Sequence, residues 1–259
     1  MKKILITGAN SYIGTSFEKY MAQWPDQYQV DTVDMIDGSW REKDFSGYDC
    51  VYHVAGIAHI KETEDNAHLY YEVNRDLAVE TAQKAKSEGV KQFVFLSTMA
   101  VYGLEEGAIS HDTEPAPKSH YGKAKYEAEL QLNALTDEGF AVAIMRPPMV
   151  YGEGCKGNYQ SLIKFAERMP FFPDYQNKRS MIHIDRLAWF AKRLVDSGEA
   201  GLILPQDEQY VCTCHMVKGI ADSMGKKMVM LKILNPAVSL VKRFTKVGKK
   251  AFGDLYYEK

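Results

Sequence analysis

The stretch Lys3–Gly14, KILITGANSYIG, decides the fold of this chain. Its first part, Lys3–Thr7, is a short apolar run that predicts a buried strand. A glycine turn follows, and from Tyr12 onward apolar side chains recur at helical spacing. A strand, a glycine turn and a helix in this order are typical of a unit that binds the phosphates of a dinucleotide at the helix N-terminus.

Each small residue in this turn has an expected task. Gly8 permits the tight turn and Gly14 lets the helix pack close to the strand, whereas Ser11 stands where a middle glycine is expected. Because the Cβ of Ser11 restricts the backbone, we expect an altered phosphate geometry but the same fold. The turn residues expected to bind the cofactor are Gly8, Asn10, Ser11, Tyr12, Ile13 and Gly14.

An acidic residue follows at the distance that a nicotinamide dinucleotide requires. Asp34 lies twenty residues after Gly14, at the end of a second predicted strand, Gln29–Asp34. A carboxylate there accepts hydrogen bonds from the adenosine ribose and repels a 2′-phosphate, which favours NAD over NADP. The adenine pocket is expected to involve residues 37–40.

Strand and helix patterns alternate along the first 150 residues, which predicts an α/β, Rossmann-type doubly wound parallel sheet. The alternation fades afterwards. We therefore predict an NAD-binding domain over 1–150, with 181–205 returning to it, and a small substrate-binding lobe over 151–259 that ends abruptly. The further strands are predicted at Cys50–Val54, Gln92–Ser97, Phe140–Met145, Met181–Ile184 and Gly201–Leu204, and the main helices at Asn66–Glu88, Tyr121–Asp137, Thr213–Ser223 and Asn235–Phe244.

Composition excludes several classes of protein. The net charge is −2 and no long basic stripe runs through the 259 residues, so nucleic acid is not an expected partner. The most basic stretch, at 242–250, is interpreted as a solvated helix face, with a weak contact to an anionic or membrane surface as the alternative. No apolar run reaches the length of a membrane span.

The cysteines point to a reducing compartment. Met1-Lys2-Lys3 runs straight into the apolar residues of the first strand, which leaves no room for a signal peptide, so we expect a cytoplasmic protein with reduced thiols. The run Cys212-Thr213-Cys214-His215 suggests a metal site, but a zinc site needs four ligands and a second pair is missing. We expect no metal.

A tyrosine and a lysine supply the chemistry of proton transfer. Tyr121 and Lys125 are four residues apart on a predicted helix and share a face. A phenol can exchange a proton with a substrate alcohol if a nearby ammonium lowers its pKa, and a hydroxyl is needed to hold the substrate oxygen. Thr98, after the fourth strand, is expected to provide that hydroxyl.

At these residues the chain resembles the extended short-chain dehydrogenases/reductases, and more narrowly their NAD-dependent nucleotide-sugar epimerase/dehydratase group. The resemblance covers about residues 2–205 and rests on motifs that are specific in combination. They are TGANSYIG (7–14), VYHVAG (51–56), VNRD (73–76), LSTMAVYG (96–103), YGKAK (121–125), RPPMVYG (146–152) and RSMIHIDRLA (179–188).

The resemblance implies roles for individual residues. Ala55 and Gly56 would line the adenosine side of the cofactor, Pro147 would lie by the nicotinamide, and Lys125 would bond the nicotinamide ribose. Asn74 would support the sheet beside the site. Thr98 and Tyr121 would contact the 4-hydroxyl of a sugar, and Asn158 and Arg179 would meet the diphosphate of a substrate that is expected to be UDP-linked.

Three functions remain open from the sequence. The first is a UDP-sugar 4-epimerase (UDP-glucose or UDP-N-acetylhexosamine type) acting by transient hydride transfer at C4. The second is an NAD(P)-dependent 4-keto-sugar reductase of surface-polysaccharide synthesis. The third is a non-catalytic NAD-binding protein. Dehydratases of this group carry an acidic pair where this chain has Met99 and Ala100, so elimination of water is disfavoured.

The resemblance also implies a homodimer formed through the helices predicted at Asn66–Glu88 and Tyr121–Asp137.

Overall fold

The computed structural model describes residues 1–259 apart from positions 59 and 156 and the side chain of residue 158. The chain forms two compact units. The first comprises 1–103, 115–148 and 183–205, and the second comprises 104–114, 149–182 and 206–259. The second unit includes 104–114, which the sequence division places within 1–150.

The first unit contains a six-stranded parallel sheet with the strand order β10-β6-β4-β3-β1-β2. The predicted doubly wound sheet is therefore confirmed. Its central strands are almost completely buried, as expected of a parallel sheet covered on both faces. The strands are β1 (Lys2–Thr7), β2 (Tyr28–Val33), β3 (Cys50–His53), β4 (Gln92–Leu96), β6 (Ala141–Met145) and β10 (Gly201–Ile203).

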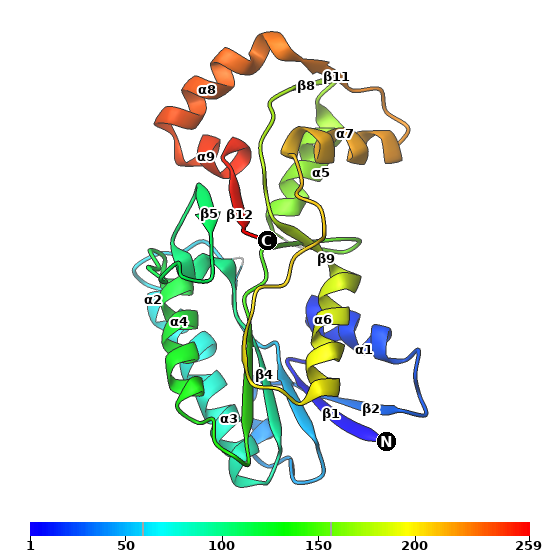
Figure 1. The fold of residues 1–259 in the computed structure, drawn as a ribbon, viewed down its shortest axis with the longest axis vertical. Coiled ribbons are helices and arrows are strands. Elements are labelled where there is room, and N and C mark those ends of the chain that lie inside the picture. The colour runs from blue at the N-terminus through cyan, green and yellow to red at the C-terminus, as the bar shows by residue number, and fades with distance from the viewer. Residues whose placement is uncertain (59, 156) are drawn as a thin grey trace. The chain divides into compact units, whose positions relative to one another are not determined.

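Helices cover both faces of this sheet (Figure 1). On one face α1 (Tyr12–Met21) packs against α6 (Ile184–Ser197). On the other face, α4 (His120–Asn133) packs against a long helical segment. The sequence predicts that segment as one helix over 66–88, whereas the structure shows α2 (Ala67–Tyr71), a π-helical turn η2 (Glu72–Asp76) and α3 (Leu77–Ser87). Short 3₁₀ turns lie at η1 (Ser39–Arg41) and η3 (Met99–Tyr102).

The second unit consists of short helices and three two-stranded pairings: β5 with β12, β7 with β9, and β8 with β11. The pairing of β5 with the C-terminal β12 is not predicted by the sequence. Among the described residues, no helix has the length and apolar character that crossing a bilayer requires. The elements are β5 (Gly107–Ile109), β7 (Met149–Tyr151), α5 (Asn158–Arg168), β8 (Phe171–Pro173), β9 (Met181–His183), α7 (Thr213–Ser223), β11 (Val229–Leu231), η4 (Lys232–Leu234), α8 (Asn235–Phe244), α9 (Lys246–Phe252) and β12 (Leu255–Tyr257).

Candidate functional site

The chemistry-bearing residues of the first unit gather at the carboxyl edge of its sheet. Parallel strands end at the same edge, so the residues that follow them are brought together. The backbone continues this alignment past the strands: Ala55 N donates to Thr7 O over 2.9 Å, and Ser97 N donates to Met145 O over 2.7 Å. In open α/β sheets ligands bind at this edge.

The glycine turn has the backbone that its sequence predicts. Gly8 has φ +107°, and a Cβ there would lie 2.9 Å from Ala55 N, so only glycine fits. Asn10, at φ 62°, is the one non-glycine residue with a positive φ among those described, and asparagine tolerates this conformation. Tyr12 and Ile13 form the first turn of α1, whose N–H groups lack carbonyl partners within the helix. These features fit a bound pyrophosphate.

Ser11 does not strain the turn. Its φ of −71° and ψ of 146° lie in the extended region that any residue adopts, and its Oγ caps α1 by accepting from Gly14 N over 3.1 Å. A Cβ on Gly14 would lie 2.7 Å from that Oγ, which shows how closely the two residues meet. The middle position of this turn therefore does not require a glycine.

Asp34 lies directly after β2 and is exposed. One of its carboxylate oxygens, Oδ1, accepts from Ile36 N over 2.9 Å, which fixes the carboxylate at the end of the strand. This position and exposure suit a contact with ribose hydroxyls. Pro147 is buried at the end of β6, where its carbonyl accepts from Met99 N over 2.9 Å.

Asn74 holds the loop that follows β3. Its buried amide bonds both backbone polar groups of one residue: Oδ1 accepts from Ile57 N and Nδ2 donates to Ile57 O, each over 3.0 Å. A Cβ on Gly56 would lie 2.6 Å from Asn74 Oδ1 and 3.3 Å from Lys125 Nζ. Asn74 lies in the π-helical turn η2, and such turns frequently occur at functional sites.

The Thr98 side chain lies close enough to Tyr121 to act on the pKa of its phenol. The close approach of α4 to η3 depends on Gly122, because a Cβ there would lie 2.8 Å from the carbonyl oxygen of Ala100. Thr98 also begins η3, where its Oγ1 accepts from Ala100 N over 3.1 Å. Burial raises the pKa of the Tyr121 phenol, and the nearby Thr98 side chain has a smaller, lowering effect.

Lys125 is buried on the same helix. Its ammonium donates to Leu96 O over 3.0 Å and lies 4.5 Å from the centre of the Phe95 ring. Burial lowers the pKa of Lys125 to about 7, and the carboxylate of Glu129, one turn further along, opposes this shift. A lysine with this pKa can change its charge near neutral pH.

Glu62 caps the helix that carries the tyrosine, and the sequence does not predict this contact. Its two carboxylate oxygens accept from the backbone N–H groups of His120, over 3.1 Å, and Tyr121, over 3.0 Å. Ser119 caps the same turn by accepting from Gly122 N over 3.0 Å. A serine just before a helix is a recognisable local signal, whereas a glutamate almost sixty residues away offers none.

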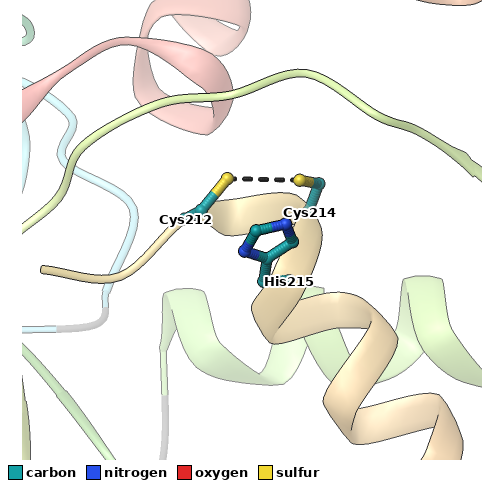
Figure 2. A group of neighbouring side chains, drawn as sticks. All are labelled: Cys212, Cys214 and His215. Carbon is teal, nitrogen blue, oxygen red and sulfur yellow. Dashed lines mark hydrogen bonds between the residues drawn. The ribbon is translucent and has the colours of Figure 1, made fainter. Parts of the chain in front are cut away.

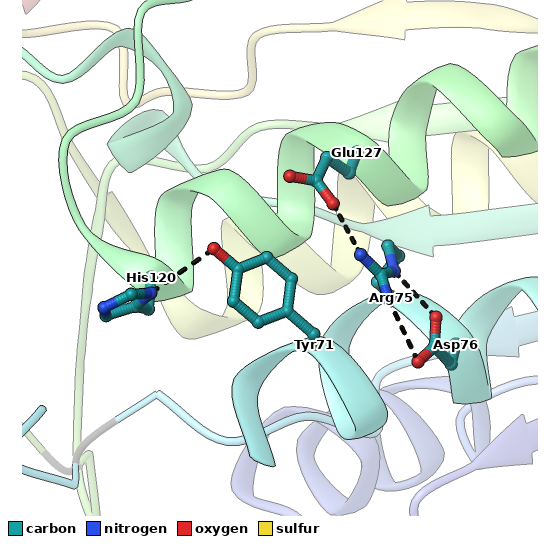
Figure 3. Close-up of polar contacts among 5 residues, drawn as sticks. All are labelled: Tyr71, Arg75, Asp76, His120 and Glu127. Atoms are coloured by element: carbon teal, nitrogen blue, oxygen red, sulfur yellow. Dashed lines mark hydrogen bonds and ion pairs between the residues drawn. The ribbon is translucent and has the colours of Figure 1, made fainter. Parts of the chain in front are cut away.

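A polar network joins the helix of Tyr121 to that of Asn74 (Figure 3). Tyr71 Oη lies 3.3 Å from His120 Nδ1. Arg75, in η2, bonds Glu127 of α4 over 2.7 Å and its neighbour Asp76 over 2.7 Å. These contacts join α4 to α2 and η2, which lie in the two segments predicted to form the dimer.

His53 ends β3 in a fully buried position and is a packing residue. Its Nδ1 is 2.7 Å from Thr7 Oγ1, and its ring stacks on Phe93 and Phe95. Burial lowers the pKa of His53 to about 3, with the charge of Lys125 as a smaller cause. The imidazole is therefore neutral at physiological pH.

Arg179, which the resemblance assigns to the substrate diphosphate, lies in the second unit. Its backbone bridges Val211 and Leu255, and its guanidinium donates to Gly253 O over 3.0 Å. Burial lowers the pKa of Arg179, an effect that the charges of two nearby carboxylates, Asp254 and Glu106, oppose. The side chain of Asn158, the other residue expected at the diphosphate, lies outside the described residues.

Cys212, Cys214 and His215 lie together at the start of α7 (Figure 2). The two sulfurs are 3.2 Å apart in a hydrogen bond, and the three candidate ligand atoms are within 4.8 Å of one another. Burial raises the pKa of the Cys214 thiol to about 12. The absence of a metal remains a prediction.

The sequence matches the NAD dependent epimerase/dehydratase family over residues 4–203. It is 32% identical over 261 aligned residues to a UDP-glucose 4-epimerase of Vibrio cholerae, covering 90% of this chain and 79% of that protein. It is 24% identical to the N-acetyl-alpha-D-glucosaminyl-diphospho-ditrans,octacis-undecaprenol 4-epimerase of Escherichia coli O157:H7, covering 90% and 76%.

Two solved structures share the fold. A dTDP-4-dehydrorhamnose reductase of Bacillus anthracis, in complex with NADP, superposes with a TM-score of 0.74 at 18% identity, covering 100% of this chain and 91% of that chain. A UDP-glucuronic acid 4-epimerase of Bacillus cereus, in complex with NAD, superposes with a TM-score of 0.71 at 20% identity, covering 96% and 94%. At these identities the likeness shows the fold alone.

Proposed function

Because this chain belongs to the NAD dependent epimerase/dehydratase family, we propose that it is a nucleotide-sugar 4-epimerase in which Tyr121, Thr98 and Lys125 act on the sugar C4–OH group. The observation that carries the proposal is that Thr98 lies near the Tyr121 phenol at the carboxyl edge of the sheet, with Lys125 buried one turn further along the helix of Tyr121. A protein that only bound NAD would need no such grouping.

The residues present fit an NAD cofactor. The first turn of α1 and the turn at Gly8 would hold the pyrophosphate, Asp34 the adenosine ribose, and Lys125 the nicotinamide ribose. Gly56 and Ala55 leave room on the adenosine side. NAD⁺, when bound, supplies the acceptor and then the donor of the hydride at C4.

The proton is handled by the protein. In the forward step the Tyr121 phenolate accepts the proton of the sugar 4-hydroxyl, and in the return step the phenol gives a proton back to the same oxygen. The Thr98 hydroxyl holds that oxygen within reach of Tyr121. Burial makes the phenolate costly, so positive charge from Lys125 and from the oxidised nicotinamide is needed to bring the pKa of Tyr121 down.

The expected substrate is a hexose linked to UDP. The Vibrio cholerae relative is a UDP-glucose 4-epimerase that this chain matches over most of its length. In the second unit Arg179, with its forked guanidinium, is the proposed partner of the diphosphate, together with Asn158. Met99 and Ala100 follow Thr98 without an acidic side chain, so elimination of water is not proposed.

One experiment separates epimerisation from its alternatives. The purified protein is incubated with UDP-glucose, UDP-N-acetylglucosamine and a UDP-4-keto sugar, with NAD or NADH added, while NMR follows the sugar and absorbance follows NADH. We expect the C4 epimer to form without net NADH. Stoichiometric NADH consumption with the keto-sugar alone would overturn the proposal in favour of a reductase, and inertness in every arm despite bound NAD would point to a binding protein.

A further inference from the structure

The helix α8 carries its apolar side outward. Leu240 and Phe244, four residues apart on one side of the helix, are 61% and 71% exposed, whereas Val238 on the other side is 6% exposed. A helix in a globular protein normally turns its apolar stripe toward the core. The helix α8 packs mainly against α9 and the turn η4, both next to it along the chain.

The exposed apolar surface extends beyond α8 in both directions. Ile233, in η4, is 83% exposed, and Val247, in α9, is 76% exposed. We call Ile233, Leu240, Val241, Phe244 and Val247 the α8–α9 surface (Figure 1 places both helices near the C-terminus). Contiguous exposed apolar residues rimmed by polar groups mark sites of interaction with a protein or a membrane.

The charges that the chain segment of this surface carries are all positive. Residues 223–253 include eight lysines and arginines and no aspartate or glutamate, in a chain whose net charge is −2. Lys242 and Lys249 pair with Glu106, at 3.2 Å and 3.9 Å. Arg243, Lys246 and Lys250 remain exposed beside the apolar residues.

We propose that the α8–α9 surface binds the face of a lipid bilayer that carries anionic headgroups. An exposed stripe of leucine, valine and phenylalanine flanked by an excess of cations has the composition of helices that lie in the interface between headgroups and acyl chains. A second copy of this chain is a poor occupant, because two strongly basic segments would face each other. The protein lies on the bilayer and does not span it, in keeping with the absence of a spanning helix among the described residues.

The test is flotation of the full-length protein with unilamellar vesicles of phosphatidylcholine alone or with about one third phosphatidylglycerol. One variant combines Leu240→Gln, Phe244→Gln and Val247→Gln and keeps every charge. Another combines Arg243→Gln, Lys246→Gln and Lys250→Gln and keeps the apolar stripe. Matched controls are Leu130→Gln, an exposed leucine elsewhere, and the exposed set Lys19→Gln, Lys91→Gln and Lys164→Gln.

We expect flotation with the anionic vesicles only, and its loss in about 1 M salt, which screens charges beyond ~3 Å. Each α8–α9 variant should lower the bound fraction about tenfold while the controls bind like wild type. Turnover of a soluble nucleotide sugar should stay at the wild-type rate in both, so a failure here is distinct from a failure of the proposed epimerase. If the first variant does not fold, Phe244→Ser alone replaces it.

Three results would overturn the proposal. The first is that wild-type protein stays in the bottom fraction and does not float with the anionic vesicles at low salt. The apolar variant could float as wild type does, which would reduce the contact to charge alone. Light scattering could instead find a dimer that the apolar variant converts to a monomer without vesicle binding, which would assign the surface to a second copy of the chain.

Discussion

Glu129 and Arg146 form an ion pair inside the first unit, with the guanidinium Nε 3.1 Å from both carboxylate oxygens. The two side chains are 2% and 8% exposed. Ser97 donates to the same carboxylate, and Arg146 donates from Nη1 to Tyr102 Oη over 2.8 Å. The pair therefore ties α4 to the ends of β4 and β6, one helical turn from Lys125.

Removing one partner of this pair should be costly. Glu129→Gln or Arg146→Met alone leaves an uncompensated buried charge, and we expect each to lower the free energy of unfolding by about 3–5 kcal/mol. The double variant should lose much less than the sum. Urea unfolding of all four proteins measures this, with the exposed pair Arg41–Glu80 as a control of little effect. Strictly additive losses would contradict the coupling.

Replacing the phenol should stop turnover but leave the cofactor site intact. Tyr121→Phe removes the proposed proton-transfer group, so we expect kcat to fall by about 10²–10⁴ with little change in NAD affinity. Tyr126→Phe, on the same helix, is the matched control. The measurement combines the NMR assay with a fluorescence titration of NAD. Wild-type turnover by Tyr121→Phe would remove Tyr121 from the mechanism.

Lys125 should make stability depend on pH. Its pKa is about 7 in the folded protein and 10.5 as the reference value, so the unfolded chain binds more protons between these values. Stability from this group therefore rises with pH across the window from 7 to 10.5. Lys125→Met should be stabilising relative to wild type below pH 7, and this advantage should shrink by about 2–3 kcal/mol on going to pH 9.

Urea unfolding of both proteins at pH 6 and pH 9 checks this, and a difference independent of pH would show that Lys125 is not destabilised by its surroundings. The same substitution should abolish turnover. The buried lysine would then lower stability near neutral pH and be required for turnover.

The hydroxyl of Ser11, which caps α1, should determine how substitutions at this position change stability. Ser11→Ala removes the acceptor for Gly14 N and should cost about 1 kcal/mol, whereas Ser11→Gly should cost only a few tenths of a kcal/mol. Thermal unfolding and NAD titration of both variants give the measurement. If alanine were tolerated better than glycine, the hydroxyl cap would not be what Ser11 contributes.

Gly56 should be intolerant of any side chain. Gly56→Ala would place a Cβ 2.6 Å from Asn74 Oδ1, within a buried amide that cannot shift without losing its bonds to Ile57. We expect a loss of about 1–3 kcal/mol and weaker NAD binding. Gly47→Ala is the control, since nothing lies within 4 Å of its Cβ position. Equal stability of the two variants would be the contrary result.

The sequence by itself predicts the local units of this protein. The strand, turn and helix over Lys3–Gly14 and the shared helix face of Tyr121 and Lys125 follow from periodicity and from short-range constraints that a few neighbouring residues satisfy. The same holds for the helices at Thr213–Ser223 and Asn235–Phe244, whose predicted bounds match the structure.

Only the tertiary structure decides which distant residues meet. The Glu62 cap, the Glu129–Arg146 pair and the β5–β12 pairing join segments that no local pattern connects. The same is true of α8: its periodicity predicts an apolar face, but whether that face points into a core or into solvent depends on what the rest of the chain places against it. Ser11 illustrates the reverse case, because its backbone angles, invisible in the sequence, show that the turn needs no glycine there.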